Sequence, residues 1–518
     1  MKIYTSKKIV SLAILLLVTP AALRAAEPAT PKAKPNVLII MVDDMGYSDL
    51  GCFGSEIKTP NIDHLAAGGM KFSQMYNTAK CYPTRTSLQT GVYFQRTNRD
   101  FDDTATLGEV LRPAGYTTLW SGKHHAKFNP VTRGFDRYFG MIGGAENHFR
   151  PKQDNAKGWA LDGEKAATGD SGFYSTDAYT DKAIKWLDEY NKSDKPFLLY
   201  VAYTAPHWPL QAWPEDIAKY KGVYDEGYEA VRQARYERQI KLGLVDPKTS
   251  PLPPMEFGRK NTKTWDTFSP DERQVEAMKM EIYAAMVDRV DQNIGRLLGR
   301  LKAQGKLDNT LIMFLADNGA CAETPKQEGT DPDAPMGSAG SFISYGQNWA
   351  SVGNTPLRKW KQDSFEGGIS TPLIVHWPAG IEPQTEYYRE PAHLIDILPT
   401  LVAVSGAHYP GESKQPNISP MDGVSLLPAF KGESISRPTP LFFQFGKSSA
   451  IREGQWKLVR IGTKWELYDL AVDRTETNNL AAKRPEIVRK MDASWQAWWK
   501  ACTGDDWTGI PPRDKETD

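Results

Sequence analysis

The stretch Asn36-Val37-Leu38-Ile39-Ile40-Met41-Val42, which runs directly into Asp43-Asp44, decides the fold class. A short run with no charge and several β-branched residues is typical of a strand buried on both faces, as in a parallel sheet. Residues 310–316 repeat this design and run into Asp317-Asn318-Gly319. The sequence therefore predicts a buried, mainly parallel sheet whose strands end in polar residues.

Three further apolar runs extend this sheet, at residues 116–120, 196–203 and 372–376. The first of them is followed by Lys123 and His125, and the second by His207. Residues 177–190 and 273–304 carry apolar side chains at helical spacing, as helices that cover a sheet do. We therefore predict an α/β fold in which helices sandwich a large mixed, mainly parallel sheet.

Polar residues at the strand ends are expected to form one site, because ligands of open α/β sheets bind beyond the carboxyl ends of the strands. The residues expected to meet there are Asp43, Asp44, Lys123, His207, Asp317 and Asn318. The Asp-Asp and Asp-Asn pairs offer oxygen ligands, which favours Ca²⁺ or Mg²⁺ over zinc. Either pair alone could instead cap a helix or turn. Two such pairs in this architecture favour the metal.

The first 26 residues have the order of a secretory signal peptide, with Lys2, Lys7 and Lys8 before an apolar run at residues 9–18 and small residues at its end. That run is about half of the roughly 20 residues that a membrane span needs. We therefore expect a secreted or periplasmic protein with no membrane attachment after cleavage. Formal charge is zero for the whole chain and near minus four without the signal segment, which does not suggest a nucleic-acid partner.

Four cysteines, at positions 52, 81, 321 and 502, are too few and too far apart to predict a disulfide framework. Cys52, Cys321 and Cys502 are expected to be small buried residues, with a bridge between Cys52 and Cys321 left open. Cys81 has a more informative setting. Because Pro83 fits the first turn of a helix, residue 81 is expected at a helix N-terminus, where an anion is favoured.

Residues 81–91, Cys-Tyr-Pro-Thr-Arg-Thr-Ser-Leu-Gln-Thr-Gly, resemble the sulfatase signature Cys-x-Pro-x-Arg-x-x-x-Leu-x-Thr-Gly with one residue fewer before Leu88. Other segments resemble that family in the same order along the chain, at residues 59–65, 122–125, 205–209, 317–319, 361–368, 466–470 and 479–481. The resemblance implies an alkaline phosphatase-like fold. It also implies that a formylglycine-generating or sulfatase-maturating enzyme converts Cys81 to formylglycine.

The resemblance further implies a role for each site residue. The Ca²⁺ ligands, with Mg²⁺ as the second choice, would be the modified residue 81 together with Asp43, Asp44, Asp317 and Asn318. Arg85 would hold the hydrated aldehyde, while Lys123 and Lys361 would neutralise the sulfate. His207, assisted by Lys361, would protonate the leaving alcohol, and His125 would then help to expel sulfate. Histidines and lysines are more often structural or solvated, but these follow predicted strands or lie within matching motifs.

The expected reaction is hydrolysis of a sulfate ester, on a sulfated carbohydrate or an aryl sulfate. Two alternatives remain open: a formylglycine-dependent phosphodiesterase or phosphonate hydrolase, and an inactive binder of sulfated glycans. Some segments depart from the family pattern, including His124 where tryptophan is common and residues 441–447 near the end of the chain. These departures leave the sugar, the sulfated position and endo or exo action undetermined.

Two domains are expected after the signal peptide at residues 1–26. Residues 27–425 would form the catalytic domain, and residues 426–518 a smaller subdomain. Apolar runs at residues 441–445, 456–461 and 465–470 predict an antiparallel sheet in that subdomain. A closing helix is expected at residues 485–499, with its tryptophans packed on the sheet.

Overall fold

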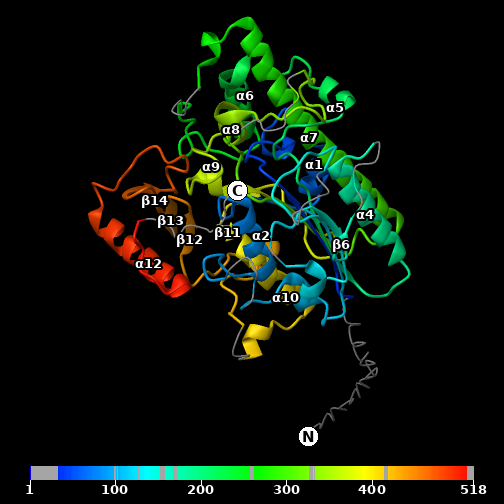
Figure 1. Cartoon of the computed structure of the whole chain (residues 1–518). Helices are drawn as coiled ribbons and strands as arrows, with labels where there is room; N and C mark the ends of the chain where they lie inside the picture. Colours follow the sequence, from blue (N-terminus) through cyan, green and yellow to red (C-terminus); the bar gives the residue numbers. More distant parts are fainter. Residues whose placement is uncertain are drawn as a thin grey trace. The chain divides into compact units, whose positions relative to one another are not determined.

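The computed structural model describes residues 1, 33–97, 101, 103–126, 128–151, 158–166, 168, 172–256, 262–325, 331, 333–413 and 418–509. Contacts divide the chain into two units, Met1–Lys34 and Pro35–Asp518. Every helix and strand described here belongs to the second unit (Figure 1). The predicted signal peptide, apart from Met1, lies outside the described residues.

A single large sheet forms the centre of the second unit. Its described strands run in the order β10-β2-β9-β8-β1-β7-β3-β4-β5-β6, with β11 beside β2. Strands β8, β1, β7, β3 and β4 are parallel neighbours, whereas β9 is antiparallel to β8 and β2. The predicted mixed, mainly parallel sheet is therefore confirmed. The strand bounds are β1 Asn36–Val42, β2 Met70–Tyr76, β3 Thr117–Gly122, β4 Arg137–Met141, β5 Trp159–Leu161, β6 Glu164–Lys165, β7 Phe197–Ala202, β8 Thr310–Ala316, β9 Ser370–His376, β10 Tyr387–Tyr388 and β11 Ala392–His393.

Helices cover both faces of this sheet. Alternate residues of β1 belong to two different hydrophobic clusters, one on each face. Leu38 and Ile40 pack with side chains from helices α1, α4 and α7. Val37 and Ile39 pack with side chains from α2, α3 and α10. A strand buried on both faces in this way needs the continuous apolar run that the sequence shows. The helix bounds are α1 Pro60–Ala67, α2 Cys81–Thr90, α3 Leu107–Leu111, α4 Ser175–Glu189, α5 Pro214–Ala218, α6 Gly227–Lys241, α7 Pro270–Ala303, α8 Gly346–Gly353, α9 Glu366–Ile369, α10 Ile397–Ser405 and α11 Leu427–Phe430.

A second, smaller sheet lies near the end of the chain. It is antiparallel, in the order β12 Leu441–Phe445, β13 Ser448–Glu453, β14 Trp456–Ile461 and β15 Lys464–Asp469. Helix α12 Pro485–Thr503 closes it, as Figure 1 shows in red beside the orange strands. Trp495, Trp498 and Trp499 are buried in this packing, so they pack on the sheet as expected. Strand β13 was not predicted, and the boundary at residues 425 and 426 stays a prediction.

Two further expectations concern the membrane and the cysteines. Among the described helices, none combines the length and the apolar character that a membrane crossing requires. All four cysteines lie within the described residues, and all are free thiols, so Cys52 and Cys321 are not bridged.

Candidate active site

The ends of β1 and β8 bring four oxygen-bearing side chains together. These strands pair in parallel with Val42 opposite Ala316, so Asp43-Asp44 and Asp317-Asn318 lie side by side. The Asp44 backbone N–H donates to Asp317 Oδ1 at 3.2 Å, and Asn318 Nδ2 donates to Asp44 Oδ1 at 2.7 Å. All four side chains are buried. Asp44 itself adopts a left-handed backbone with φ of 65°, which a non-glycine residue adopts only where the surrounding structure holds it there.

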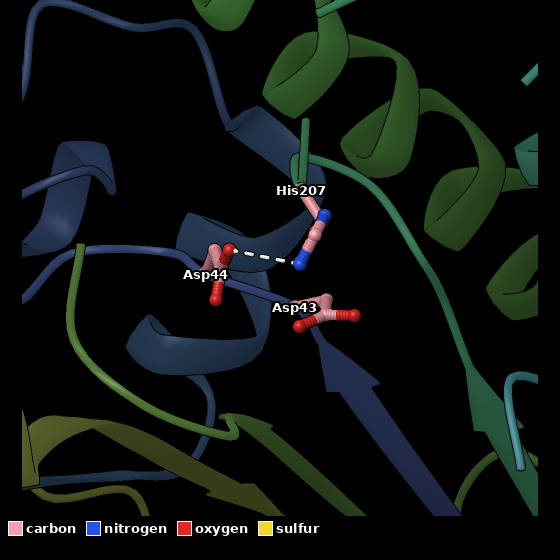
Figure 2. A group of neighbouring side chains, drawn as sticks. All are labelled: Asp43, Asp44 and His207. Atoms are coloured by element: carbon pink, nitrogen blue, oxygen red, sulfur yellow. Dashed lines mark ion pairs between the residues drawn. The ribbon is translucent and has the colours of Figure 1, made fainter. Parts of the chain in front are cut away.

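These residues fit a divalent cation. Within the part of the chain that the structure describes, Asp43 Oδ1 and Asn318 Oδ1 are buried and have no hydrogen-bond partner. Burial and the neighbouring Asp43 carboxylate raise the pKa of Asp317, as expected for carboxylates crowded together without a cation. Asp43, Asp44 and His207 also offer ligand atoms within 4.8 Å of one another (Figure 2). The strand ends could therefore hold a metal ion, and His207 faces the same place.

Helix α2 carries Cys81 at its first position and contacts the strand ends through Arg85. The helix begins at Cys81, as Pro83 predicted, and Cys81 is only 2% exposed. One turn later, Arg85 Nη2 donates to Asp317 Oδ2 at 2.8 Å, and it lies 3.6 Å from Asp43 Oδ2. Arg85 Nη1 also donates to the Lys123 carbonyl oxygen at 3.4 Å. These contacts tie the helix to three strand ends at once.

Two buried lysines reach the same carboxylates. Lys123, directly after β3, donates from Nζ to Asp43 Oδ2. Lys361, in the loop before α9, donates from Nζ to Asp44 Oδ2 at 2.8 Å. Burial opposes the charge of Lys361, but Asp44, Cys321 and Glu323 together outweigh burial and raise the pKa of Lys361 well above the ordinary value. Lys361 is therefore held as a cation inside the site.

His207 completes the cluster, and Figure 2 shows it beside Asp43 and Asp44. Its Nε2 lies 3.4 Å from Asp44 Oδ2 and 3.3 Å from Lys361 Nζ. Its Nδ1 lies 2.6 Å from the Trp208 carbonyl oxygen. Since a carbonyl can only accept, Nδ1 carries a proton, and Nε2 of the neutral ring is left as an acceptor. Burial lowers the pKa of His207 to about 4 despite the nearby Asp44.

His125 lies beside the nucleophile segment. Its ring makes an edge-to-face contact with Tyr82, the chain neighbour of Cys81, with centroids 5.8 Å apart. The backbone of His125 is left-handed, with φ of 59°, and its N–H donates to the Ile142 carbonyl oxygen. The structure thus brings all the residues predicted for the site to one edge of the sheet, with His125 at the side of Tyr82.

Sequence reasoning missed one acidic member of this group, Glu323. It accepts a hydrogen bond from Lys80 Nζ at 2.9 Å and another from Trp208 Nε1 at 3.2 Å. Burial raises its pKa, but Lys361 and Lys80 together lower it below the ordinary value. Glu323 lies six residues after Asp317, so an acidic residue soon after a strand end was the signal that could have found it.

Comparisons with known proteins agree with this architecture. The sulfatase family model matches residues 35–407. A second model, described as the C-terminal part of N-sulphoglucosamine sulphohydrolase, matches residues 360–497. Together these two ranges include the large sheet, the cluster at its edge, the small sheet and most of its closing helix.

Two relatives are similar over most of their length. The chain is 35% identical to an arylsulfatase of Klebsiella aerogenes over 437 residues, which cover 77% of this chain and 92% of the relative. It is 34% identical to an uncharacterised sulfatase of Schizosaccharomyces pombe, covering 89% of this chain and 93% of the relative.

Solved structures share the fold. The crystal structure of Ps i-CgsB superposes with a TM-score of 0.68 at 26% identity, covering 92% of this chain and 95% of that one. The family model alone covers well over half of the chain. The chain therefore belongs to the sulfatase family, and it is a hydrolase of sulfate esters.

Proposed function

We propose that this sulfatase removes sulfate from a sulfated carbohydrate, using a formylglycine made from Cys81 and a Ca²⁺ ion held at the ends of β1 and β8. One observation carries the proposal. Arg85, one turn from Cys81 on helix α2, is ion-paired with Asp317 at 2.8 Å. The residue to be modified and the oxygen ligands are therefore parts of a single buried site.

A carbohydrate substrate has support among the relatives. The chain is 26% identical to a canine N-acetylgalactosamine-6-sulfatase over 86% of its length and 74% of the relative's. The Ps i-CgsB structure, at 26% identity, is also known in complex with k-i-k-neocarrahexaose, with a TM-score of 0.67. Aryl sulfates are expected to be cleaved as well, because a phenol leaves with less help from an acid than a sugar alcohol does.

Calcium suits the donor set better than magnesium. Asp43, Asp44, Asp317 and Asn318 supply several protein oxygens at once, and Mg²⁺ usually keeps more water and takes fewer protein ligands. When bound, the cation would supply Lewis acidity toward the sulfuryl oxygens, and modified residue 81 would supply the nucleophile. The two buried oxygens that lack a partner within the described residues, Asp43 Oδ1 and Asn318 Oδ1, support this assignment.

The cationic side chains would bind and orient the sulfate group. Lys123 and Lys361 donate to Asp43 and Asp44 respectively. Both ammonium groups are buried, which strengthens their attraction for an anion by excluding water. Arg85, held by Asp317 and by the Lys123 carbonyl oxygen, would fix the side chain of residue 81.

Proton transfer would use the pair formed by His207 and Lys361. The Trp208 carbonyl oxygen fixes the proton on His207 Nδ1, so His207 Nε2 accepts a hydrogen bond from the Lys361 ammonium, 3.3 Å away. A proton held between these two atoms can be delivered to the oxygen of the leaving alcohol. His125, beside Tyr82, would accept the proton released when sulfate leaves.

The burial of helix α2 supports modification of residue 81 before the protein folds. All ten residues of α2 are buried in the folded protein, so a maturation enzyme cannot reach Cys81 after folding. Conversion would therefore occur on the unfolded chain, before or during export. The partner would be a formylglycine-generating or sulfatase-maturating enzyme, and the destination the periplasm or the exterior, as the N-terminal segment predicts.

The test is a panel of sulfated monosaccharides and 4-nitrophenyl sulfate, scored for free sulfate with protein co-expressed with a maturation enzyme. Turnover of at least one sulfated sugar supports the proposal. An aryl phosphodiester tested in parallel distinguishes phosphoryl transfer. Matured protein that binds the sugars but releases no sulfate would contradict it.

A further inference from the structure

Glu323 joins three segments that carry proposed catalytic residues. Its Oε1 accepts from Lys80 Nζ at 2.9 Å and from Gln362 Nε2. Its Oε2 accepts from Trp208 Nε1 at 3.2 Å and lies 3.4 Å from Lys361 Nζ. The donors lie 243 and 115 residues away for Lys80 and Trp208, so the contacts are purely tertiary.

The carboxylate of Glu323 has no capacity left for substrate. A carboxylate offers about four acceptor sites, and each oxygen of Glu323 already faces two nitrogen donors. The Cys321 thiol is also within 3.5 Å of Oε2. A residue saturated in this way orients its partners and does not itself bind a sugar hydroxyl.

The donors of Glu323 flank the proposed chemistry. Lys80 precedes Cys81, and Trp208 follows His207, while Lys361 is a member of the site. Resting on the function proposed above, we propose that Glu323 is a positioning residue for sulfate-ester hydrolysis. It holds the start of α2, the His207 segment and the Lys361 loop in register around one carboxylate.

The loop that carries Lys361 needs such support. Lys359 and Gln362, on either side of Lys361, both have left-handed backbones, with φ of 65° and 80°. Non-glycine residues persist in that region only when tertiary contacts hold them. Two backbone hydrogen bonds contribute, from Lys361 N–H to the Ala320 carbonyl oxygen and from Gln362 N–H to the Ala79 carbonyl oxygen. Glu323 supplies a side-chain contact to Lys361 and to Gln362.

Glu323 also balances charge at the site. Lys361 has two carboxylate neighbours, Asp44 and Glu323. Asp44 belongs to the proposed cation ligands, which leaves Glu323 as the counter-ion of Lys361 and Lys80. Without that negative charge both lysines would attract sulfate more strongly, in the substrate and in the product alike.

The experiment compares Glu323→Gln, which keeps shape and removes charge, with Glu323→Asp, which keeps charge and shortens the side chain. For E323Q, kcat should fall by about 10- to 100-fold, with KM unchanged or lower and inorganic sulfate bound more tightly in calorimetry. For E323D, kcat should also fall while sulfate affinity returns toward that of the wild type. The comparison of the two variants distinguishes the effect of a shorter side chain from the effect of a lost negative charge.

Glu256→Gln is the matched control. Glu256 pairs with Arg358 and with Lys359 on the same loop. Among the contacts of the described residues, none joins Glu256 to a site residue named above. E256Q should keep kcat and sulfate affinity. Equal losses of kcat in E256Q and E323Q would overturn the specific role of Glu323. A folded E323Q variant with the kcat and sulfate affinity of the wild type would overturn it as well. Matured wild type that releases no sulfate would instead contradict the proposed function. In that case, comparing the sulfate affinities of the wild type and E323Q would still test the effect of the Glu323 charge.

Discussion

Arg85 on helix α2 and Asp317 at the end of β8 form a buried ion pair, with Nη2 of the arginine 2.8 Å from Oδ2 of the aspartate. The same guanidinium lies 3.6 Å from Asp43 Oδ2. Breaking a buried pair from one side leaves an uncompensated charge, which typically costs about 3–5 kcal/mol. In this protein the charge left behind would be in the proposed cation site.

Arg85→Gln should therefore destabilise the protein in a metal-dependent way. In the presence of a chelator, the free energy of unfolding should fall by about 3 kcal/mol or more, because Asp43 and Asp317 lose their arginine. Added Ca²⁺ should recover much of that loss, since a bound ion stabilises the folded state. Urea unfolding with EDTA and with excess Ca²⁺ measures both values. An equal loss under the two conditions would argue against a cation at these carboxylates.

His207→Gln should slow catalysis in proportion to the basicity of the leaving group. General acid catalysis typically contributes about 10²- to 10⁴-fold, and a nitrophenolate needs little of it. The loss of kcat should therefore be small with 4-nitrophenyl sulfate and large with a sugar sulfate. Side-by-side kinetics on the two substrates provide the measurement. A uniform loss would place His207 in binding and not in proton transfer.

Lys457→Met should break the ion cluster that joins the small sheet to the start of helix α9. Lys457 Nζ on β14 lies 2.8 Å from Glu366 Oε1 and 2.7 Å from Glu476 Oε1, and all three side chains are fully buried. The two carboxylates would lose their shared cation, so the free energy of unfolding should fall by about 3–5 kcal/mol.

A matched control for this substitution is Lys490→Met. Lys490 pairs with Glu453 on the surface, where the two side chains are 68% and 41% exposed. Its removal should change stability by less than about 0.5 kcal/mol. Similar losses for the two variants in urea unfolding would show that burial of the Lys457 cluster is energetically unimportant.

His393 predicts a pH dependence of stability. Burial, aided by Arg437, lowers the pKa of His393 well below 6.5, and its Nδ1 accepts from the Ile395 N–H at 3.2 Å. Below pH 6.5 the unfolded chain therefore binds a proton that the folded protein does not, and stability falls by about 1.4 kcal/mol per pH unit. His393→Asn retains an acceptor and should lack this contribution. Urea unfolding at pH 7.5, 6.5 and 5.5 gives the free energy of unfolding at each pH. This free energy should fall more steeply with decreasing pH in the wild type than in H393N, and an equal pH dependence would be the contrary result.

Apolar patterning located the central strands because burial on both faces leaves a clear signal. The predicted run from Asn36 to Val42 is the observed β1, and residues 310–316 are the observed β8. The run at residues 372–376 is also a strand, but β9 lies antiparallel to β8. An apolar run reports burial and carries no information on strand direction. Strand β13 was missed because Ser448 and Ser449 begin it with polar side chains.

The strand-end residues could be predicted to meet because parallel strands end at a common edge. The position of Glu323 soon after a strand end was a signal, but its contacts could not be predicted, because its partners are contributed by separate segments that only the folded chain brings together. The ionic cluster of Lys457 escaped notice for the same reason. Glu366 lies in a segment that resembled the family signature, but its partners Lys457 and Glu476 lie more than ninety residues further along the chain.

Activity is expected to require that residue 81 be converted before the protein acts. Mass spectrometry of the peptide containing residue 81 gives the converted fraction, and sulfate release from the same preparation gives kcat per molecule. Preparations made with increasing amounts of maturation enzyme should show turnover proportional to that fraction, with Cys81→Ala inactive but folded and Cys502→Ala unaffected. Turnover in preparations where residue 81 remains an unmodified cysteine would show that conversion is not required.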